Sequence, residues 1–276
     1  MTGTVLVTGA TDGLGKAVSV ELARAGATVL VHGRTPERAQ EAVAEIRLAS
    51  GSTFLRACAG DLASLAQVRS LAGEIADSEP RLDVLVNNAG IGTVGPGGGE
   101  ERLESTDGYE LRFAVNYLAP FLLTRLLEPL LVRSAPARIV NVASAGQAPL
   151  DFDDVMLEDG YDGGRAYSQS KLAMVTWTFD LAERLAGQGV TATVLHPGTY
   201  MPTKMVLAAG VEPFDSIETG VRSTLRLIAD PELDGVTGRY FDRLREAQAR
   251  PQAYDPDARR KLRELSERLA GLTVAR

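Results

Sequence analysis

Short apolar segments rich in β-branched residues alternate along this chain with segments of helical periodicity. Near-continuous apolar strands separated by helices are typical of a parallel sheet that is covered on both faces. The alternation therefore predicts a doubly wound α/β sheet of about seven strands with helices on both faces. Strands are expected at 4–8, 27–31, 53–58, 82–87, 138–142, 190–196 and 236–241. Helices are expected near 14–25, 36–49, 64–77, 106–133, 165–187, 216–229 and 257–270.

Length and composition indicate an ordinary soluble protein with one core. No repeat or change of composition marks a linker, so we expect a single domain over 1–276. The net charge of −7 and the pI near 5.1 disfavour a nucleic-acid partner and an anionic membrane. No apolar run is long enough to span a bilayer, and the first strand leaves no room for a signal peptide. With Cys58 as the single cysteine, a reducing, cytoplasmic location is expected.

A glycine-rich run, Thr8–Gly15, follows the first strand and opens the first helix. Glycines let the backbone turn tightly and approach a pyrophosphate, which the free N–H groups of a helix N-terminus stabilise. The spacing G-x-x-x-G-x-G differs from the commoner G-x-G-x-x-G, and alone it could be a plain strand-to-helix turn. Its place at the first such junction favours a dinucleotide site in a Rossmann-type fold. The cofactor contacts expected in this run are Gly9, Thr11, Asp12, Gly13, Leu14 and Gly15.

The end of the second strand bears on the choice between NADP and NAD. A site for NAD usually has a carboxylate there to bind the ribose, whereas an arginine accommodates a 2′-phosphate. Gly33 and Arg34 occupy this position, and no acid stands beside them. An exposed arginine at a helix start is also common. The sequence favours NADP, with NAD as the alternative.

Tyr167 and Lys171 lie four residues apart in an expected helix, which places them on one face, one turn apart. A phenol beside an ammonium group has its ionised form favoured, so we expect the pKa of Tyr167 to fall from about 10 toward the range of an acid catalyst. Bringing it near neutrality takes about 4 kcal/mol, to which an oxidised nicotinamide ring could contribute. Packing alone can also produce this spacing, so the pair gains meaning from its neighbours.

Those neighbours form an ordered set. Together the motifs resemble the classical short-chain dehydrogenase/reductases over roughly residues 3–245, and the combination is more specific than any member of it. The motifs are Thr8–Gly15, Asn87-Asn88-Ala89-Gly90, Asn116, Ser144 and the pair Tyr167/Lys171. The sequences of several segments resemble those of the family branch that includes retinol dehydrogenases. These segments are Gly60–Leu65, Leu82–Gly90 and, less specifically, the tail from Gly238-Arg239-Tyr240-Phe241.

The resemblance implies a role for each matching residue. Tyr167 would donate a proton to the carbonyl oxygen on reduction or remove one from the alcohol on oxidation. Lys171 would lower the pKa of Tyr167 and hold the nicotinamide ribose. Ser144 would hydrogen-bond the substrate oxygen, and Asn116 would hold a helix kink and a water that relays protons to Lys171. The further cofactor contacts implied are Asp61, Leu62, Asn88, Ala89, Gly90, Pro197, Gly198 and Thr199, with Thr203 as an alternative to Thr199.

Two segments depart from the family pattern. Residues 145–166 lengthen the connection between Ser144 and Tyr167 and contain six carboxylates among apolar residues. A metal site is conceivable, but the spacing lacks the pattern of a calcium loop, and a solvated flap with an apolar underside is favoured. The second departure follows the sixth strand, where the candidate threonines are shifted. His32 and His196 lie at strand ends among apolar residues, which favours structural roles over a metal site.

The region near 199–220 is expected to form a substrate lid, and 245–276 a helical tail. Apolar residues of the lid, with Leu150, Phe152 and Met156 opposite, predict a hydrophobic ketone or alcohol. The lid residues are Tyr200, Met201, Met205, Val206, Leu207, Val211 and Phe214. The leading interpretation is an NADP-dependent carbonyl reductase or alcohol dehydrogenase.

Other interpretations stay open. The chain could use NAD, reduce a C=C bond, or be a nucleotide-sensing binding protein with a silent site. The helix around 113–127 is apolar on more than one face, which suits burial under other elements or in a subunit interface. The family resemblance favours a homodimer or a homotetramer.

Overall fold

A computed structural model describes residues 3–92, 101–208 and 210–272. Its centre is one eight-stranded sheet in the order β3-β2-β1-β4-β5-β6-β7-β8. The first seven strands run parallel, and β8 pairs antiparallel with β7. The strands are β1 (Thr4–Val7), β2 (Thr28–Gly33), β3 (Leu55–Ala59), β4 (Val84–Asn87), β5 (Ala137–Val142), β6 (Val190–His196), β7 (Arg239–Asp242) and β8 (Arg245–Ala247).

The predicted α/β fold and all seven predicted strands are confirmed, and the eighth strand corrects the expected number. β8 is three residues long and reads Arg-Glu-Ala, so it lacks the apolar run by which the other strands are recognised. The tail predicted as helical from 245 therefore begins with a strand, and its helix starts at Pro256.

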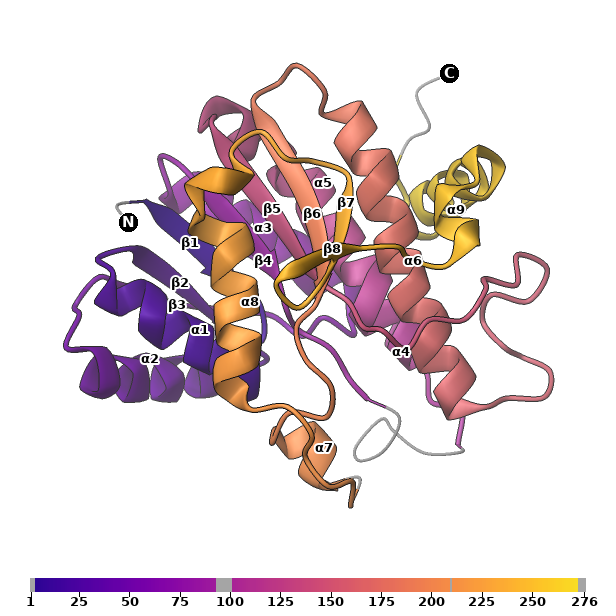
Figure 1. The fold of residues 1–276 in the computed structure, drawn as a ribbon, viewed down its shortest axis with the longest axis horizontal. Coiled ribbons are helices and arrows are strands. Elements are labelled where there is room, and N and C mark those ends of the chain that lie inside the picture. Colours follow the sequence, from indigo (N-terminus) through magenta and orange to yellow (C-terminus); the bar gives the residue numbers. More distant parts are fainter. Residues whose placement is uncertain (1–2, 93–100, 209, 273–276) are drawn as a thin grey trace.

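Helices cover both faces of the sheet (Figure 1). One layer holds α1, α2 and α8, and the other holds α3, α5 and α6, with α9 outside α6. The helices of three turns or more are α1 (Gly13–Arg24), α2 (Pro36–Ser50), α3 (Leu65–Ser78), α5 (Ala119–Arg133), α6 (Gly163–Arg184), α8 (Ile217–Ala229) and α9 (Pro256–Leu269). The short ones are α4 (Leu111–Phe113), a π-helical turn (Ala114–Leu118), α7 (Lys204–Ala208) and two 3-10 turns (Pro231–Leu233 and Pro251–Tyr254).

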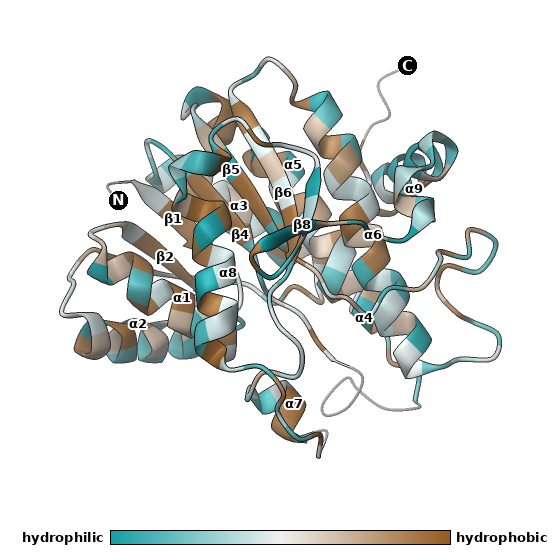
Figure 2. Ribbon diagram, in the orientation of Figure 1, coloured by the Kyte–Doolittle hydropathy of each residue, from teal (hydrophilic) through white to brown (hydrophobic). Residues whose placement is uncertain are grey.

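The apolar stretch at Leu111–Arg133 is covered by its own chain. By length and composition this stretch passes as a membrane span, although no such run was expected from the sequence, and 72% of its most apolar window is buried inside the fold. It packs against α3, and helix α9 also reaches it: the Tyr117 hydroxyl is 2.6 Å from the Ser266 hydroxyl, and Arg125 pairs with Glu267. Hydrophobic residues concentrate in the central strands, whereas α9 is mostly hydrophilic (Figure 2). Burial under other elements, one of the two alternatives left open, accounts for this helix.

The extended connection before α6 matches the predicted flap. Leu150, Val155 and Leu157 are buried beneath it, while Asp153 and Glu158 face solvent. Asp154 accepts hydrogen bonds from the backbone N–H groups of Glu158 and Asp159, so this carboxylate closes a local turn. Among the residues that the structure describes, no group of three or more histidine, cysteine or acidic side chains is placed to hold a metal.

The strand order reverses between β1 and β4, because β1 pairs with β2 on one side and β4 on the other. Crossovers on the two sides of this point cover opposite faces of the sheet, which leaves a crevice outside the carboxyl ends of the strands. The candidate site lies in that crevice.

Candidate active site

A cleft of about 950 Å³ opens at the carboxyl ends of the strands. It is lined by every residue predicted to catalyse or bind the cofactor except Asn116. These lining residues are Gly9, Thr11, Asp12, Gly13, Leu14, Gly15, Arg34, Asp61, Leu62, Asn88, Ala89, Gly90, Ser144, Tyr167, Lys171, Pro197, Gly198 and Thr199. Residues separated by up to 190 positions in the sequence thus meet on one surface. This convergence is what the ordered motifs predicted.

The glycine-rich turn is held tightly against the end of β4. Gly9 has a φ of 65°, and a Cβ built on it would lie 2.9 Å from the Ala89 backbone, so a larger residue would clash. A Cβ on Gly15 would collide with the Gly9 carbonyl. The Asp12 carboxylate accepts a hydrogen bond from the Gly13 N–H and caps α1. The first turn of α1 therefore lines the cleft with its backbone close to any ligand.

His32 is a lining residue whose role the sequence left as merely structural. The Gly9 N–H donates to His32 Nδ1 at 3.1 Å, and the other ring nitrogen, Nε2, lies 2.9 Å from the Gly60 carbonyl. Burial lowers the pKa of His32, so the ring is neutral and can accept at one nitrogen while donating at the other. The ring thereby joins the glycine-rich turn to the end of β3.

Thr8 fixes the segment after β4. Its hydroxyl oxygen accepts the backbone N–H groups of Asn88 at 2.9 Å and Ala89 at 3.1 Å. The Asn88 side-chain amide donates back to the Thr8 carbonyl at 2.9 Å. These bonds orient Asn88, Ala89 and Gly90 along the cleft, and Thr8 itself is buried behind them.

Arg34 projects from the end of β2 as an exposed side chain on the rim of the cleft. The preceding Gly33 packs against α2, because a Cβ there would lie 2.8 Å from the Ala39 nitrogen. Asp61, an acid that also lines the cleft, follows β3, not β2. The end of β2 is thus followed by an exposed arginine, and none of its own residues is a carboxylate.

Ser144, Tyr167 and Lys171 meet at the other half of the cleft. Ser144 follows β5, and Tyr167 and Lys171 come from the first turns of α6, where Asp162 caps the helix. The Lys171 Nζ lies 5.7 Å from the centre of the Tyr167 ring and donates to the Val142 carbonyl at 3.1 Å. Lys171 is 5% exposed, and burial lowers its pKa to about 8.

The predicted lowering of the Tyr167 pKa is wrong for the groups of the protein itself. Burial raises the pKa of Tyr167, the Ser144 hydroxyl lowers it in part, and the charge of Tyr200 adds to the rise. The Lys171 ammonium lies beside the Val142 carbonyl and over the Tyr167 ring. The spacing of four residues placed the two side chains on one helix face but did not fix the distance between their charged ends.

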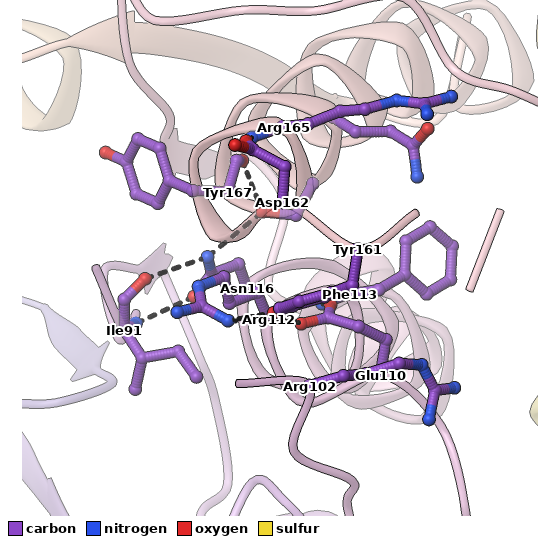
Figure 3. Close-up of polar contacts among 12 residues, drawn as sticks. Ile91, Arg102, Glu110, Arg112, Phe113, Asn116, Tyr161, Asp162, Arg165 and Tyr167 are labelled. Atoms are coloured by element: carbon purple, nitrogen blue, oxygen red, sulfur yellow. Dashed lines mark hydrogen bonds and ion pairs between the residues drawn. The ribbon is translucent and has the colours of Figure 1, made fainter. Parts of the chain in front are cut away.

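Asn116 lies one layer behind the cleft. The helix opens into a π-helical turn at Ala114–Leu118, which is the kink expected at Asn116. The Asn116 side chain accepts a hydrogen bond from the Ile91 N–H at 2.8 Å and donates to the Ile91 carbonyl at 3.1 Å (Figure 3). It also donates to the Ser170 hydroxyl at 3.0 Å. A Cβ on Gly90 would lie 3.2 Å from Asn116 Oδ1 and 3.4 Å from Lys171 Nζ. Asn116 and Lys171 thus both lie close to Gly90, and the Asn116 side chain binds the segment after β4.

Arg112 binds the same segment one helical turn earlier, and it was not among the residues predicted from the sequence. Its guanidinium is fully buried, donates to the Gly92 carbonyl at 2.9 Å and pairs with Glu110 at 3.4 Å. Tyr161 joins this pair through hydrogen bonds to Arg112 and, at 2.9 Å, to Glu110 (Figure 3). The ion pair of Arg112 and Glu110 therefore joins the extended connection before α6, through Tyr161, to the segment after β4, through Gly92.

The two candidate threonines after β6 have different surroundings. Thr199 hydrogen-bonds His196 at 3.0 Å and accepts from Arg243 at 3.1 Å. Thr203 lies against the glycine-rich turn, where a Cβ on Gly13 would come within 3.0 Å of its methyl group. Both residues line the cleft, Thr199 toward β6 and Thr203 toward α1.

The half of the cleft that contains Ser144 and Tyr167, which we call the substrate half, is mostly apolar. From the predicted lid, Tyr200, Met201, Val206 and Val211 line the cleft. The expectation that Leu150, Phe152 and Met156 face them is wrong, because these side chains pack into the core of the α3–α5–α6 layer. Ile91, Leu111 and Val115 line the cleft instead, and none of them was predicted as a residue of the substrate pocket.

The residues present fit a nicotinamide dinucleotide. Gly9 and Gly15 are packed so closely that neither could carry a side chain, and the backbone of this turn lines the cleft. The N–H groups at the start of a helix stabilise a pyrophosphate. The Tyr167 phenol and the Lys171 amine line the other half of the same cleft. Fold and site thus define a dinucleotide-binding α/β protein.

Comparison with known proteins gives the family. A model of the family described as short chain dehydrogenase matches residues 3–210. Human retinol dehydrogenase 14 is 40% identical, over 98% of this chain and 86% of its own length. This chain belongs to the short-chain dehydrogenase family, and it is accordingly an NAD(P)-dependent oxidoreductase acting on an alcohol or carbonyl group.

Solved structures agree with the fold. An uncharacterized protein from Mycobacterium paratuberculosis superposes with a TM-score of 0.79 at 30% identity, covering 98% of this chain and 94% of that one. The Pseudomonas aeruginosa RhlG/NADP active-site complex superposes with a TM-score of 0.70 at 28% identity, covering 87% and 94%.

Proposed function

We propose that this chain is an NADP-dependent oxidoreductase that acts on the carbonyl or alcohol carbon of a hydrophobic substrate, with Tyr167 as the acid and base. The observation that carries the proposal is the meeting of Ser144, Tyr167 and Lys171 at the apolar half of a cleft whose other half is the glycine-rich turn. The name of the similar human protein, retinol dehydrogenase 14, agrees with an apolar alcohol as substrate.

The residues divide the chemistry among them. When bound, the nicotinamide supplies or accepts the hydride. The Ser144 hydroxyl would hydrogen-bond the substrate oxygen, and Tyr167 would donate a proton to that oxygen on reduction. Lys171 is charged below about pH 8, so at neutral pH it would stabilise the phenolate that Tyr167 becomes. The apolar wall around them excludes water and strengthens these interactions.

The acid–base role is tested with Tyr167→Phe. We expect turnover of an apolar ketone, followed by nicotinamide absorbance, to fall about 10³-fold, while the Kd for NADPH stays within about 2-fold. Tyr200→Phe is the matched control, because it removes another phenol from the same cleft. Full activity of Tyr167→Phe would reject the assigned acid. Turnover limited to C=C bonds, or NADPH binding by the natural chain without any turnover, would favour the alternative functions.

The choice of NADP is tested at the end of β2. The exposed Arg34 guanidinium is the cation available there for a 2′-phosphate, and the NADP complex of the similar Pseudomonas protein agrees with this choice. We expect Arg34→Met to weaken NADP binding about 10- to 100-fold and to leave NAD binding within about 2-fold. Arg38→Met, one turn into α2, serves as the control. Tighter binding of NAD than NADP by the natural chain would reject the proposal.

A homodimer or homotetramer, a cytoplasmic location and the absence of a membrane span remain predictions from the sequence. Sedimentation of the purified chain measures its mass in solution, and a monomer would contradict the first of them.

A further inference from the structure

The segment that carries the lid leaves the sheet after β6 and ends at Asp215, just before α8, and its two ends are joined. The Asp215 N–H donates to the Thr199 carbonyl at 2.9 Å, and the Phe214 N–H donates to the Tyr200 carbonyl at 3.1 Å. The Thr199 N–H in turn donates to the Asp215 carboxylate at 2.6 Å. We call residues 199–200 and 214–215 the lid base.

Arg243, from the turn between β7 and β8, crosses the lid base. Its Nε and Nη2 both donate to the same Asp215 oxygen, at 3.0 and 2.6 Å, and Nη2 also lies 3.1 Å from the Thr199 hydroxyl. One guanidinium therefore binds the first and the last residue of the lid base at once. The backbone of Arg243 is anchored too, since its N–H donates to the His196 carbonyl at 2.8 Å.

The local backbone is strained in a way that this arrangement accounts for. Arg243 has a φ of 53° and Tyr200 a φ of 46°, both in the left-handed region that residues with a side chain rarely adopt. Such conformations persist where the surroundings hold them. Arg243 is held by the Asp215 carboxylate, the Thr199 hydroxyl, the His196 carbonyl and, at 2.8 Å, the carboxylate of its neighbour Asp242.

The lid base borders both ligands of the proposed reaction. Pro197, Gly198, Thr199 and Tyr200 line the same cleft as Ser144 and Tyr167. A Cβ on Gly198 would lie 3.3 Å from the Asp215 side chain, so the carboxylate also packs under this backbone. A shift of the lid base would move the wall of the substrate pocket.

We propose that Arg243 is a positioning residue that locks the lid base through Asp215 and Thr199 and so sets the shape of the substrate half of the cleft. The inference rests on the proposed function for its effect on turnover, but not for its effect on the lid. Arg243 does not touch the reacting atoms on this account. Its loss should weaken substrate binding more than it slows the chemical step.

The experiment compares Arg243→Gln with Arg245→Gln, which removes an exposed arginine two residues away on the same hairpin and changes the net charge equally. In hydrogen exchange, we expect Arg243→Gln to speed the exchange of the backbone amides of 200–208 and 210–214 by about 10-fold, with β5 and β6 unchanged. In turnover, we expect KM for the apolar ketone to rise about 10-fold, with kcat within about 3-fold. Arg245→Gln should match the natural chain in both.

Two further variants keep the test decisive if Arg243→Gln fails to fold. Arg243→Lys keeps the charge but cannot reach Asp215 and Thr199 together, so partial loosening of the lid is expected. Asp215→Asn keeps the arginine and removes the charge that it binds, so the lid should loosen as in Arg243→Gln. In a double-mutant cycle the effects of Arg243→Gln and Asp215→Asn should be far from additive.

Unchanged exchange of the lid amides in Arg243→Gln or Asp215→Asn would overturn the inference, as would faster exchange spread evenly over β5 and β6. A natural chain that does not bind NADPH or turn over any ketone would instead refute the proposed function. The exchange comparison of the lid would still decide the role of Arg243 in that case.

Discussion

The floor of the cleft, by which we mean Lys171, Asn116 and Arg112, is buried, whereas much of the lid over the cleft is exposed to solvent. Beneath the catalytic half, Lys171, Asn116 and Arg112 are each at most 5% exposed, and each has a partner on a neighbouring element. On the lid, Leu207 and Phe214 are 57% and 78% exposed, and between the two ends of the lid base Lys204 forms an exposed ion pair with Asp12 at 2.7 Å. The proposed chemistry thus depends on buried, mutually fixed groups, whereas the substrate wall belongs to a segment whose side chains are largely exposed. Three predictions test this contrast.

The largest effect is expected at Arg112. Arg112→Met removes one partner of a buried ion pair and leaves the Glu110 carboxylate without its charge partner, so the free energy of unfolding should fall by about 3–5 kcal/mol. Denaturant unfolding followed by circular dichroism measures it. Arg34→Met, at an exposed site, should change stability by less than about 0.5 kcal/mol. A loss below about 1 kcal/mol at Arg112 would show that the floor is less tightly built than described.

The second prediction concerns Lys171, whose proposed role in catalysis requires a buried charge that destabilises the folded protein. Because burial lowers its pKa from 10.5 to about 8, the unfolded chain binds more protons than the folded protein between these pH values. The free energy of unfolding therefore rises with pH over this window, and at pH 7 the buried charge destabilises the fold. Lys171→Met should raise the free energy of unfolding at pH 7 by about 2–3 kcal/mol while abolishing turnover.

Lys204→Met, which alters an ammonium that is 78% exposed, is the matched control and should leave stability nearly unchanged. The same titration predicts that turnover of the natural chain falls as the pH rises through about 8, because Lys171 then loses its charge. A Lys171→Met protein that is less stable than the natural chain at pH 7 would contradict the assigned burial cost.

The smallest effect is expected on the lid. Phe214→Ser replaces a side chain that is mostly exposed, so the free energy of unfolding should change by less than about 0.5 kcal/mol. Phe121→Ser, in the fully buried part of α5, is the contrasting variant and should cost about 3 kcal/mol or more. Equal losses in the two proteins would erase the distinction between lid and core.

Most of the fold could be predicted from the sequence because strand and helix segments have different periodicities. The β8 strand could not, since a three-residue polar strand carries no such signal. Within the site, the glycine-rich turn, Ser144 and Tyr167 stood in recognisable motifs. His32, Arg112 and Arg243 did not, because each acts through a partner that only the folded chain brings near. The direction of the Tyr167 pKa shift was missed for the same reason, as burial is a property of the whole fold.

The docking of α9 has a consequence for how the molecule is made. Tyr117 lies in the π-helical turn before α5, and its hydrogen-bond partner, Ser266, follows 149 residues later. A ribosome synthesises Tyr117 long before Ser266, so during translation the face that α9 covers stays without this cover until the last helix has emerged. The order of synthesis thus exposes the Tyr117 face of this helix while the later strands of the sheet are still being added.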